Sequence, residues 1–305
     1  MLPDITKESA KENAKARSVP INRVGMSNIA IPVHVTGCNG ELLASKANVD
    51  VTVSLDDPNA KGIHMSRLYT LLQQYLSNRD LHRSALKTLM SELVDSQEGL
   101  SKKAEVTLGF DLTVLRPALH SDAHGYQSYK ATLCVERHNA QNAMKVTISI
   151  PYSSTCPCSA SLSRSALSQT FAQEFEGKNL SVHTVSNWLA SKQASIATAH
   201  AQRSFAHITL SLRDNSIPNF IEIINLAEHA LGTPLQTAVK REDEQAFAKL
   251  NAENLMFVED AVRRLYHAFS TYYKATHFHV KVEHQESLHA HDAIAEIHGI
   301  VGIDC

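Results

Sequence analysis

The 305-residue sequence contains no apolar run that approaches the ~18 residues of a membrane-spanning helix. Its N-terminal stretch is polar and charged, with Asp4, Lys7 and Glu8, so it offers no apolar core for a signal peptide. The cysteines number five, which is odd, and their spacing does not form a disulfide framework. Because chains without structural disulfides are typical of reducing compartments, these absences together predict a cytoplasmic protein.

The sequence also lacks a charge excess of either sign. Its net charge of −2 gives no global field that would favour nucleic acid or a membrane, so any anionic ligand must be held by a local basic cluster. What the chain does have is the composition of a globular protein, 43% hydrophobic and 20% charged. Its length suffices for one large or two ordinary domains. Its 17 histidines are many for this length and crowd toward the C-terminus.

Apolar residues follow strand and helix periodicities in an order that predicts an α+β fold with two modules. We expect residues 1–20 to form a polar arm and residues 21–159 to form the first module. Within it Val106, Leu108 and Phe110 alternate with other residues, which is typical of a half-buried strand. The expected elements are strands over 23–35 and 49–55, helices from 65 and over 84–94, and strands over 104–115, 126–136 and 146–150.

A similar order of elements recurs in residues 198–305, which we predict to form a second module. Residues 160–197 lie between the modules and are rich in Ser, Ala and Gln, with Leu167 and Phe171 at near-helical spacing. They are expected to be a helical insertion, either a lid or interface element or a hairpin without a function. The elements expected in the second module are a strand over 205–212, helices over 220–230 and 258–271, and strands over 277–284 and 293–303.

Two cysteines flank a proline directly after the apolar run 146–151, in the sequence Cys156-Pro157-Cys158. Proline fixes its own φ and disfavours helical backbone in the residue before it, so the strand should end here. A thiolate is a soft ligand for zinc or iron and is also a nucleophile. Two cysteines this close do not easily bind one tetrahedral ion together, so we expect one to ligate and the other to act separately. The alternative is a pair of half-buried small apolar residues.

Three further stretches carry groups suited to a metal or a polar substrate. His200 precedes a predicted strand, with Arg203 close behind; imidazole is a common metal ligand, and guanidinium suits carboxylate or phosphate. Glu244 ends a charged run that begins at Lys240. Glu259 lies beside inward apolar residues of a predicted helix, where a carboxylate would pair with two adjacent N–H groups of a ligand. The alternatives are a structural histidine, a solvated charge run and ordinary acidity at a helix N-terminus.

The stretch 283–292 contains three histidines and three carboxylates between two predicted strands, among them Glu286 and His289. Groups that titrate near neutral pH are candidates for general acid and base catalysis, and the alternative is a histidine-rich surface loop. A second loop carries Lys61, His64 and Arg67 before a predicted helix. This arrangement fits an anion site at a helix N-terminus, although most such loops bind nothing.

In their combination and order these stretches resemble the GTP cyclohydrolase type IB family of prokaryotes, which opens folate biosynthesis. The resemblance implies the tunnelling fold (T-fold), with two ββααββ-like modules per subunit and antiparallel sheets that carry helices on one face. It also implies a homo-oligomer with four subunits, in which the active sites form at subunit interfaces. The matching motifs lie at residues 61–67, 156–159, 199–204, 240–244, 258–262 and 286–289.

The resemblance further implies one divalent metal per active site (Mn²⁺, Fe²⁺ or Zn²⁺), bound by Cys156, His200 and Glu244 with an open position for water. Glu259 matches the carboxylate that binds the guanine edge. The insertion separates Cys156 from His200 by more than is common in the family. By motif the catalytic residues are Cys158, Glu286 and His289, and the candidates for the triphosphate are Lys61, His64, Arg67 and Arg203.

The implied reaction converts GTP to 7,8-dihydroneopterin triphosphate and formate, the first step of tetrahydrofolate biosynthesis. Three alternatives stay open. One is an archaeal-type GTP cyclohydrolase that ends at a 2',3'-cyclic phosphate. Another is a nitrile reductase of the same fold that uses a covalent cysteine and NADPH. The last is a non-catalytic pterin- or purine-binding protein, against which the set Cys156, His200 and Glu244 argues, because a binding protein has no use for an open metal site.

Overall fold

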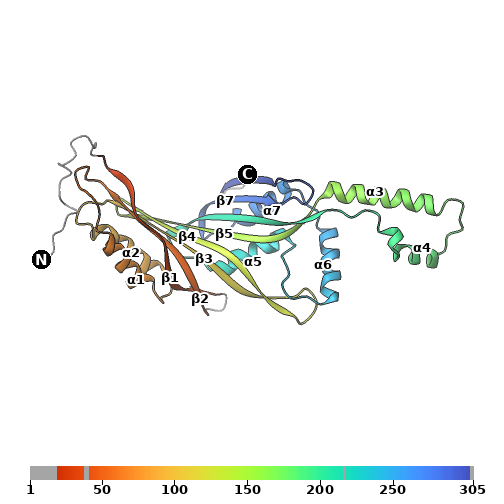
Figure 1. The fold of residues 1–305 in the computed structure, drawn as a ribbon, viewed down its shortest axis with the longest axis horizontal. Helices are drawn as coiled ribbons and strands as arrows, with labels where there is room; N and C mark the ends of the chain where they lie inside the picture. Colours follow the sequence, from red (N-terminus) through yellow and green to blue (C-terminus); the bar gives the residue numbers. More distant parts are fainter. Residues whose placement is uncertain (1–18, 38–40, 216, 303–305) are drawn as a thin grey trace.

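The computed structural model describes residues 19–37, 41–215 and 217–302, so the predicted polar arm lies almost wholly outside the described residues. The described strands form one antiparallel sheet whose spatial order follows the chain from β1 to β8 (Figure 1). The strands are β1 (Ile21–Thr36), β2 (Leu42–Leu55), β3 (Lys103–Pro117), β4 (His124–His138), β5 (Gln141–Thr155), β6 (Ala201–Leu212), β7 (Ala275–His284) and β8 (Ala293–Ile300).

Alternating burial along the strands confirms the predicted period of two. In β3, Val106, Leu108 and Leu112 are buried, whereas Thr107 and Asp111 on the other face are more exposed. A strand buries every second side chain when only one face of its sheet is covered by helices. The helix-covered face of the sheet therefore carries the core, and the opposite face is polar.

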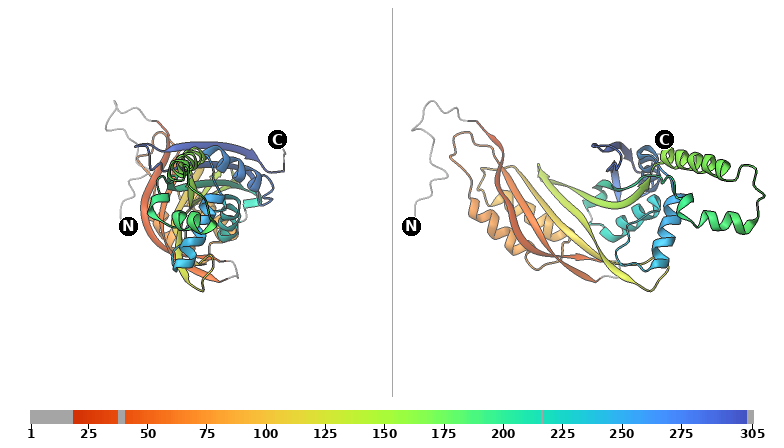
Figure 2. Two further views of the ribbon diagram at one scale, coloured as in Figure 1. Left: turned by 90° about the vertical axis from the view of Figure 1, so that its right-hand side faces the viewer. Right: turned by 45° about the vertical axis from the view of Figure 1, so that its right-hand side comes forward.

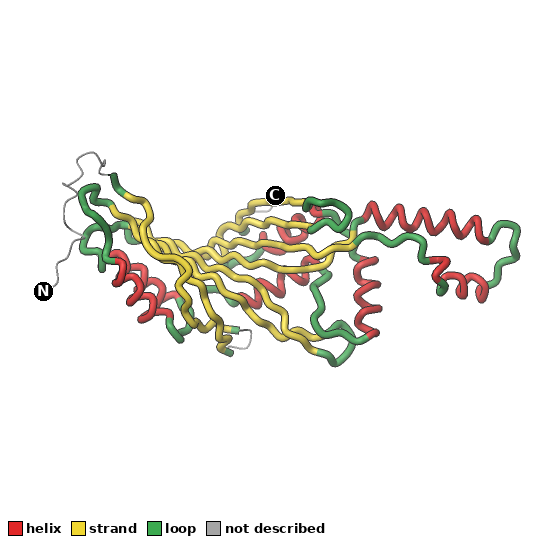
Figure 3. Tube along the Cα trace, in the orientation of Figure 1, coloured by secondary structure: helices red, strands yellow, loops and turns green. Residues whose placement is uncertain are grey.

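Helices α1, α2, α5 and α7 lie along this sheet in two groups (Figures 1 and 3). In the first, α1 packs on β1 and α2 on β3 and β4; in the second, α5 packs on β5 and α7 on β7 and β8. The sheet itself continues unbroken from the first group to the second. The helices are α1 (Met65–Leu76), α2 (Arg83–Asp95), α3 (Pro157–Glu174), α4 (Val182–Leu189), α5 (Phe220–Leu231), α6 (Arg241–Glu253) and α7 (Val258–Ser270), with 3₁₀ turns at Lys192–Ala194 and Arg213–Asn215.

β5 is longer than expected, because the predicted strand ended at residue 150 and the structure continues it to Thr155. Pro151 lies inside it, and proline removes a donor from the ladder. The proline is tolerated because the pairing of β5 with β4 ends at Ser149, while Pro151 still pairs with Phe205 of β6. This extension brings Cys156 directly to the end of the strand.

α6 was not predicted, since its first residues looked like a solvated charge run. Glu242, Asp243 and Glu244 form its first turn, where negative charge is favoured by the helix dipole. Asp243 is fully buried, so the solvated alternative is wrong for this residue. No helix among the described residues is long and apolar enough to cross a membrane.

Helices α3 and α4 make up most of the predicted insertion and extend away from the rest of the molecule (Figures 1 and 2). Ala160, in its first turn, is the buried residue of α3, and Trp188 is that of α4. The hairpin is held together by ring contacts of Trp188 with Phe171 and Phe175. Both ends of this hairpin lie at the end of the sheet where β5 stops and β6 starts.

Candidate active site at the end of the sheet

Cys156 lies where β5 ends and α3 begins. Its N–H donates to the carbonyl of His200 at 3.2 Å, which extends the β5–β6 pairing by one step. Pro157 occupies the first helical position, where the missing N–H costs nothing and the fixed φ suits the helix. Cys158 follows in the first turn of α3 and is exposed, whereas Cys156 is half-buried. The two thiols therefore differ in their exposure to solvent.

His200 is held from three sides. Its N–H donates to Ser159 Oγ at 3.1 Å, and its ring Nδ1 lies 2.9 Å from Gln202 Oε1 and 3.6 Å from Glu286 Oε2. Both side chains of the His200–Glu286 pair are mostly buried, with 19% and 15% of their surface exposed. These contacts use Nδ1, so Nε2 is the ring nitrogen that can face a ligand. Gln202 in turn donates to Ser154 Oγ at 2.9 Å.

Gln202 was missed by sequence reasoning. It follows His200 by two positions in an extended segment, so the two side chains lie on the same face, and this spacing was the available signal.

Glu286 and His289 both lie in the loop between β7 and β8, but they differ in position. The N–H of the preceding residue, Gln285, donates to the carbonyl of Arg203 at 3.2 Å and fastens the start of the loop to β6. His289 is exposed and stacks on His291, with ring centroids 5.0 Å apart. The structure therefore brings Glu286 to His200 and leaves His289 on the surface of the loop.

Glu259 stands at the same end of the sheet. It lies in the first turn of α7, and the segment before this helix is tied to β5 because the N–H of Met256 donates to the carbonyl of Thr155 at 3.2 Å. The Glu259 charge also acts on His284, the last residue of β7. Thr155 itself has a buried hydroxyl oxygen without a hydrogen-bond partner among the described residues.

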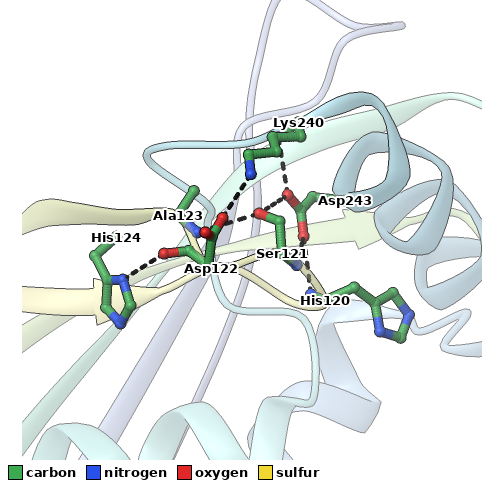
Figure 4. A network of polar contacts seen from close by, with 7 residues as sticks. All are labelled: His120, Ser121, Asp122, Ala123, His124, Lys240 and Asp243. Carbon is green, nitrogen blue, oxygen red and sulfur yellow. Dashed lines mark hydrogen bonds and ion pairs between the residues drawn. The ribbon is translucent and has the colours of Figure 1, made fainter.

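Glu244, by contrast, is exposed in the first turn of α6. Its neighbour Asp243 accepts hydrogen bonds from the N–H groups of His120 and Ser121 and from the Ser121 hydroxyl, all in the loop between β3 and β4 (Figure 4). The Ser121 hydroxyl is the main cause that holds the pKa of Asp243 well below its usual range. Lys240 completes the network through an ion pair with Asp122. This network fixes the start of α6 against a loop far away in sequence.

Within a single chain the ligand atoms of Cys156, His200 and Glu244 do not all lie within 4.8 Å of one another. Among the described residues, one group of at least three potential metal ligands has its ligand atoms within 4.8 Å of one another, and this group is Glu105, Cys134 and Glu136.

The group of Glu105, Cys134 and Glu136 is a candidate metal site on β3 and β4 that the sequence did not indicate. Its carboxylates already have cationic partners, since Arg23 pairs with Glu105 and Lys145 lies 3.8 Å from Glu136. Burial raises the pKa of the Cys134 thiol, which disfavours the thiolate that a metal requires.

Lys61, His64 and Arg67 lie near the start of α1, at the opposite end of the molecule from α3 (Figure 1). The Arg67 guanidinium pairs with Glu98 at 2.9 Å and donates to the carbonyl of Ser96. Arg203, the remaining candidate for a phosphate group, is exposed on β6 close to His200. A single chain therefore gathers Cys156, His200, Arg203, Glu259 and Glu286 at one end and leaves the other basic residues remote.

Comparison of the sequence with those of known proteins places the chain in a family. A sequence model described as type I GTP cyclohydrolase FolE2 matches residues 2–295. A protein named GTP cyclohydrolase FolE2 from Pseudoalteromonas atlantica is 47% identical over 295 residues, which cover 96% of this chain and 95% of that protein. The chain belongs to the type I GTP cyclohydrolase FolE2 family. A second FolE2 protein, from Hydrogenovibrio crunogenus, is 44% identical over 90% of this chain and 88% of its own length.

Solved structures add information on the fold of this FolE2 family member. Uricase from Arthrobacter globiformis superposes with a TM-score of 0.52 at 7% identity, covering 93% of this chain and 95% of that one. A uricase from Bacillus fastidious gives a TM-score of 0.50 at 8% identity over 91% and 93% of the two chains. At this identity the likeness concerns the fold alone, a mixed α and β architecture on an antiparallel sheet.

Proposed function

We propose that this enzyme hydrolyses GTP to 7,8-dihydroneopterin triphosphate and formate with one divalent metal per active site. Membership of the FolE2 family makes the chain a type IB GTP cyclohydrolase of folate biosynthesis. The observation that carries the metal-dependent part is the junction of Cys156 and His200, with Glu286 at the His200 ring. No observation favours one of the three alternative functions.

The residues at this junction fit a metal. Histidine ligands in metal sites usually donate their second ring N–H to a carboxylate or a carbonyl, which fixes the tautomer and the ring orientation. Here Gln202 Oε1 and Glu286 Oε2 take Nδ1, so His200 Nε2 and Cys156 Sγ are the expected ligand atoms. A mixed sulfur and nitrogen set suits zinc or iron(II), and with a carboxylate also manganese. A divalent metal bound there would supply an activated water at neutral pH.

The third ligand is proposed to be Glu244 of a neighbouring subunit. Glu244 is exposed at the start of a helix that the Asp243 network fixes in place, so it is presented outward in a defined position. Lys61, His64 and Arg67 lie far from Cys156 within one chain, so they are proposed to bind the triphosphate from a neighbouring subunit. Arg203 is proposed to bind it from the subunit that supplies Cys156 and His200. This arrangement requires a homo-oligomer, and we propose the tetramer with two ββααββ-like modules per subunit that the resemblance implies.

The remaining groups have separate proposed roles. Glu259 binds the two adjacent N–H groups of the guanine edge and so orients the purine toward Cys156 and His200. Glu286 and His289 are proposed to move protons during ring opening and release of formate, and Cys158 is proposed as a further proton donor. The buried Thr155 hydroxyl supports a polar ligand at this place, because an unpaired buried hydroxyl is costly until a partner arrives.

The proposal is tested by reconstitution. Metal-depleted protein is incubated with GTP and with manganese, iron(II) or zinc added separately, and the products are analysed for a fluorescent pterin after oxidation and for formate. Pterin and formate in equal amounts with at least one metal support the proposal. A pterin that retains a cyclic phosphate would show the archaeal-type reaction instead, and the absence of both products with every metal would contradict cyclohydrolysis.

A further inference from the structure

A buried polar pair lies directly beneath the candidate site. Tyr152 of β5 and His284 of β7 are almost completely buried, with 0% and 2% of their surface exposed. The Tyr152 hydroxyl and His284 Nε2 are 2.8 Å apart, and the two rings meet edge to face with centroids 5.9 Å apart. This hydrogen bond joins two strands that are not neighbours in the sheet.

The pair crosses over β6, the strand that lies between them. By register Tyr152 stands opposite Ser204 of β6, and Ser204 stands opposite His284 of β7, so the three residues form one line across the sheet. Ser204 is small and fully buried, which leaves room above it for the two rings to touch. Its hydroxyl is engaged sideways with Ser154 Oγ at 2.8 Å.

This line of residues lies next to the site on all three strands. Going from the line toward the end of the sheet, β5 leads to Cys156, β6 leads back to His200, and β7 leads to Glu286. The pair therefore ties β5 to β7 just before their site residues. The loop that holds Glu286 starts immediately after His284. The position of His284 therefore sets where this loop leaves the sheet, and with it the position of the Glu286 carboxylate.

We propose that Tyr152 and His284 are positioning residues whose hydrogen bond holds Glu286 against His200 during the reaction. The inference rests on the role proposed above for His200 and Glu286 and deepens it.

The chemistry of the pair suits such a brace. Burial lowers the pKa of His284 to about 4 and raises that of Tyr152, so both groups are neutral at the pH of the cell. The charged groups that act on the pair are Glu259, near His284, and Arg264, near Tyr152. A neutral polar pair in an apolar core contributes mainly direction, because a hydrogen bond needs a defined geometry that apolar contacts do not.

The test is the variant Tyr152→Phe, which keeps the ring and removes only the hydroxyl. We expect kcat to fall by about tenfold, with KM for GTP within about twofold of the wild type and with unchanged metal content, since only the geometry of the reacting groups is altered. His284→Gln, whose amide can still accept from Tyr152, should retain more of kcat than His284→Leu. The control is Tyr272→Phe, because the Tyr272 hydroxyl is buried without a partner among the described residues and lies away from the site.

A double mutant separates this inference from the function on which it rests. If the brace acts through Glu286, Tyr152→Phe should cost little further activity in a Glu286→Gln background. Wild-type kcat in Tyr152→Phe, together with a loss in Glu286→Gln, would overturn the brace alone. Wild-type kcat in Glu286→Gln would overturn both the brace and the proposed role of Glu286. Losses that multiply in the double mutant would also overturn the brace.

Discussion

His200 has contacts that assign different tasks to its two ring nitrogens. Gln202 and Glu286 contact Nδ1 of the ring. The His200 carbonyl accepts from the Cys156 N–H and the His200 N–H donates to Ser159 Oγ, so the backbone of the residue is also held in place. A histidine held in this way has a set tautomer before any ligand arrives, which reduces the entropy lost on binding. The ring is therefore prepared for a ligand at Nε2.

Cys156→Ala and Glu259→Ala should fail in different ways. Loss of a thiolate ligand is expected to weaken metal binding by more than about 100-fold, since even partners outside the ligand set contribute about 10–100-fold.

Loss of the Glu259 carboxylate should leave metal content intact and raise KM for GTP by about 10–100-fold, the range of hydrogen bonds to a charged group. Metal analysis and steady-state kinetics check both expectations, with Glu253→Ala, exposed at the end of α6, as control. Equal metal content in wild type and Cys156→Ala would remove Cys156 from the ligand set.

His284 should also make the protein sensitive to acid. Its pKa is about 4 in the folded state against an ordinary value of 6.5, so the unfolded chain binds a proton more readily. The stability linked to His284 is therefore fully present above pH 6.5 and is lost as the pH falls toward 4, by up to about 3 kcal/mol. Urea unfolding at several pH values should show a flatter profile for His284→Gln than for the wild type in this window. Parallel profiles would contradict the assignment.

At the scale of elements, period alone predicted most of the fold. The helix predicted over residues 84–94 is present as α2, and its apolar residues at helical spacing, Leu86, Leu89, Met90 and Leu93, are all buried against the sheet. The prediction failed where local sequence and tertiary contacts disagree. α6 begins with charged residues, and its buried Asp243 is satisfied by a loop more than a hundred positions earlier, which no local pattern reveals.

The hairpin of α3 and α4 offers a separate element-scale prediction. Trp188 is the single tryptophan of the chain. Its ring centroid lies 5.6 Å from that of Phe171 and 5.7 Å from that of Phe175, so its fluorescence reports this hairpin alone. Because the hairpin extends from the body and α3 buries little, it should unfold before the sheet. In urea, the fluorescence transition should precede the far-ultraviolet circular dichroism transition.

Two variants test this interpretation of the hairpin. Phe171→Ala should lower the fluorescence midpoint by about 1 M urea and leave the dichroism midpoint in place, since it weakens only the local aromatic cluster. Leu162→Ala, on the exposed face of α3 with 71% of its surface accessible, should change neither midpoint. Coincident transitions in the wild type would mean that the hairpin and the sheet form one cooperative unit.

At the scale of the whole molecule, β1 and β8 are the two edges of the sheet that the described residues of one chain form. Long unpaired edge strands are templates for another chain, and this favours assembly of several subunits. The site was predictable from motifs only as a set of residues, since motif order says nothing of which chain supplies each one. The structure brings Glu286 to His200 within one chain and leaves Glu244 apart, a division that depends on where α6 is fastened.

Subunit mixing tests that division directly. Cys156→Ala and Glu244→Ala should each be inactive as homo-oligomers, because each removes one proposed metal ligand from every site. When the two are unfolded together and refolded at equal amounts, a site formed by Cys156 of one chain and Glu244 of the other is intact. Random pairing then restores about a quarter of the wild-type activity, since each of the two contributions is correct in half of the interfaces.

The matched control is a mixture of Cys156→Ala and His200→Ala. These two residues belong to the same end of one chain, joined by the hydrogen bond from the Cys156 N–H to the His200 carbonyl. No pairing of these two variants rebuilds a site, so the mixture should stay inactive although it assembles equally well. If the Cys156→Ala and Glu244→Ala mixture also stays inactive, with oligomers confirmed by size, all three ligands must come from one subunit. α6 would then have to move toward His200 in the assembled enzyme, against the hydrogen bonds that Asp243 makes with Ser121.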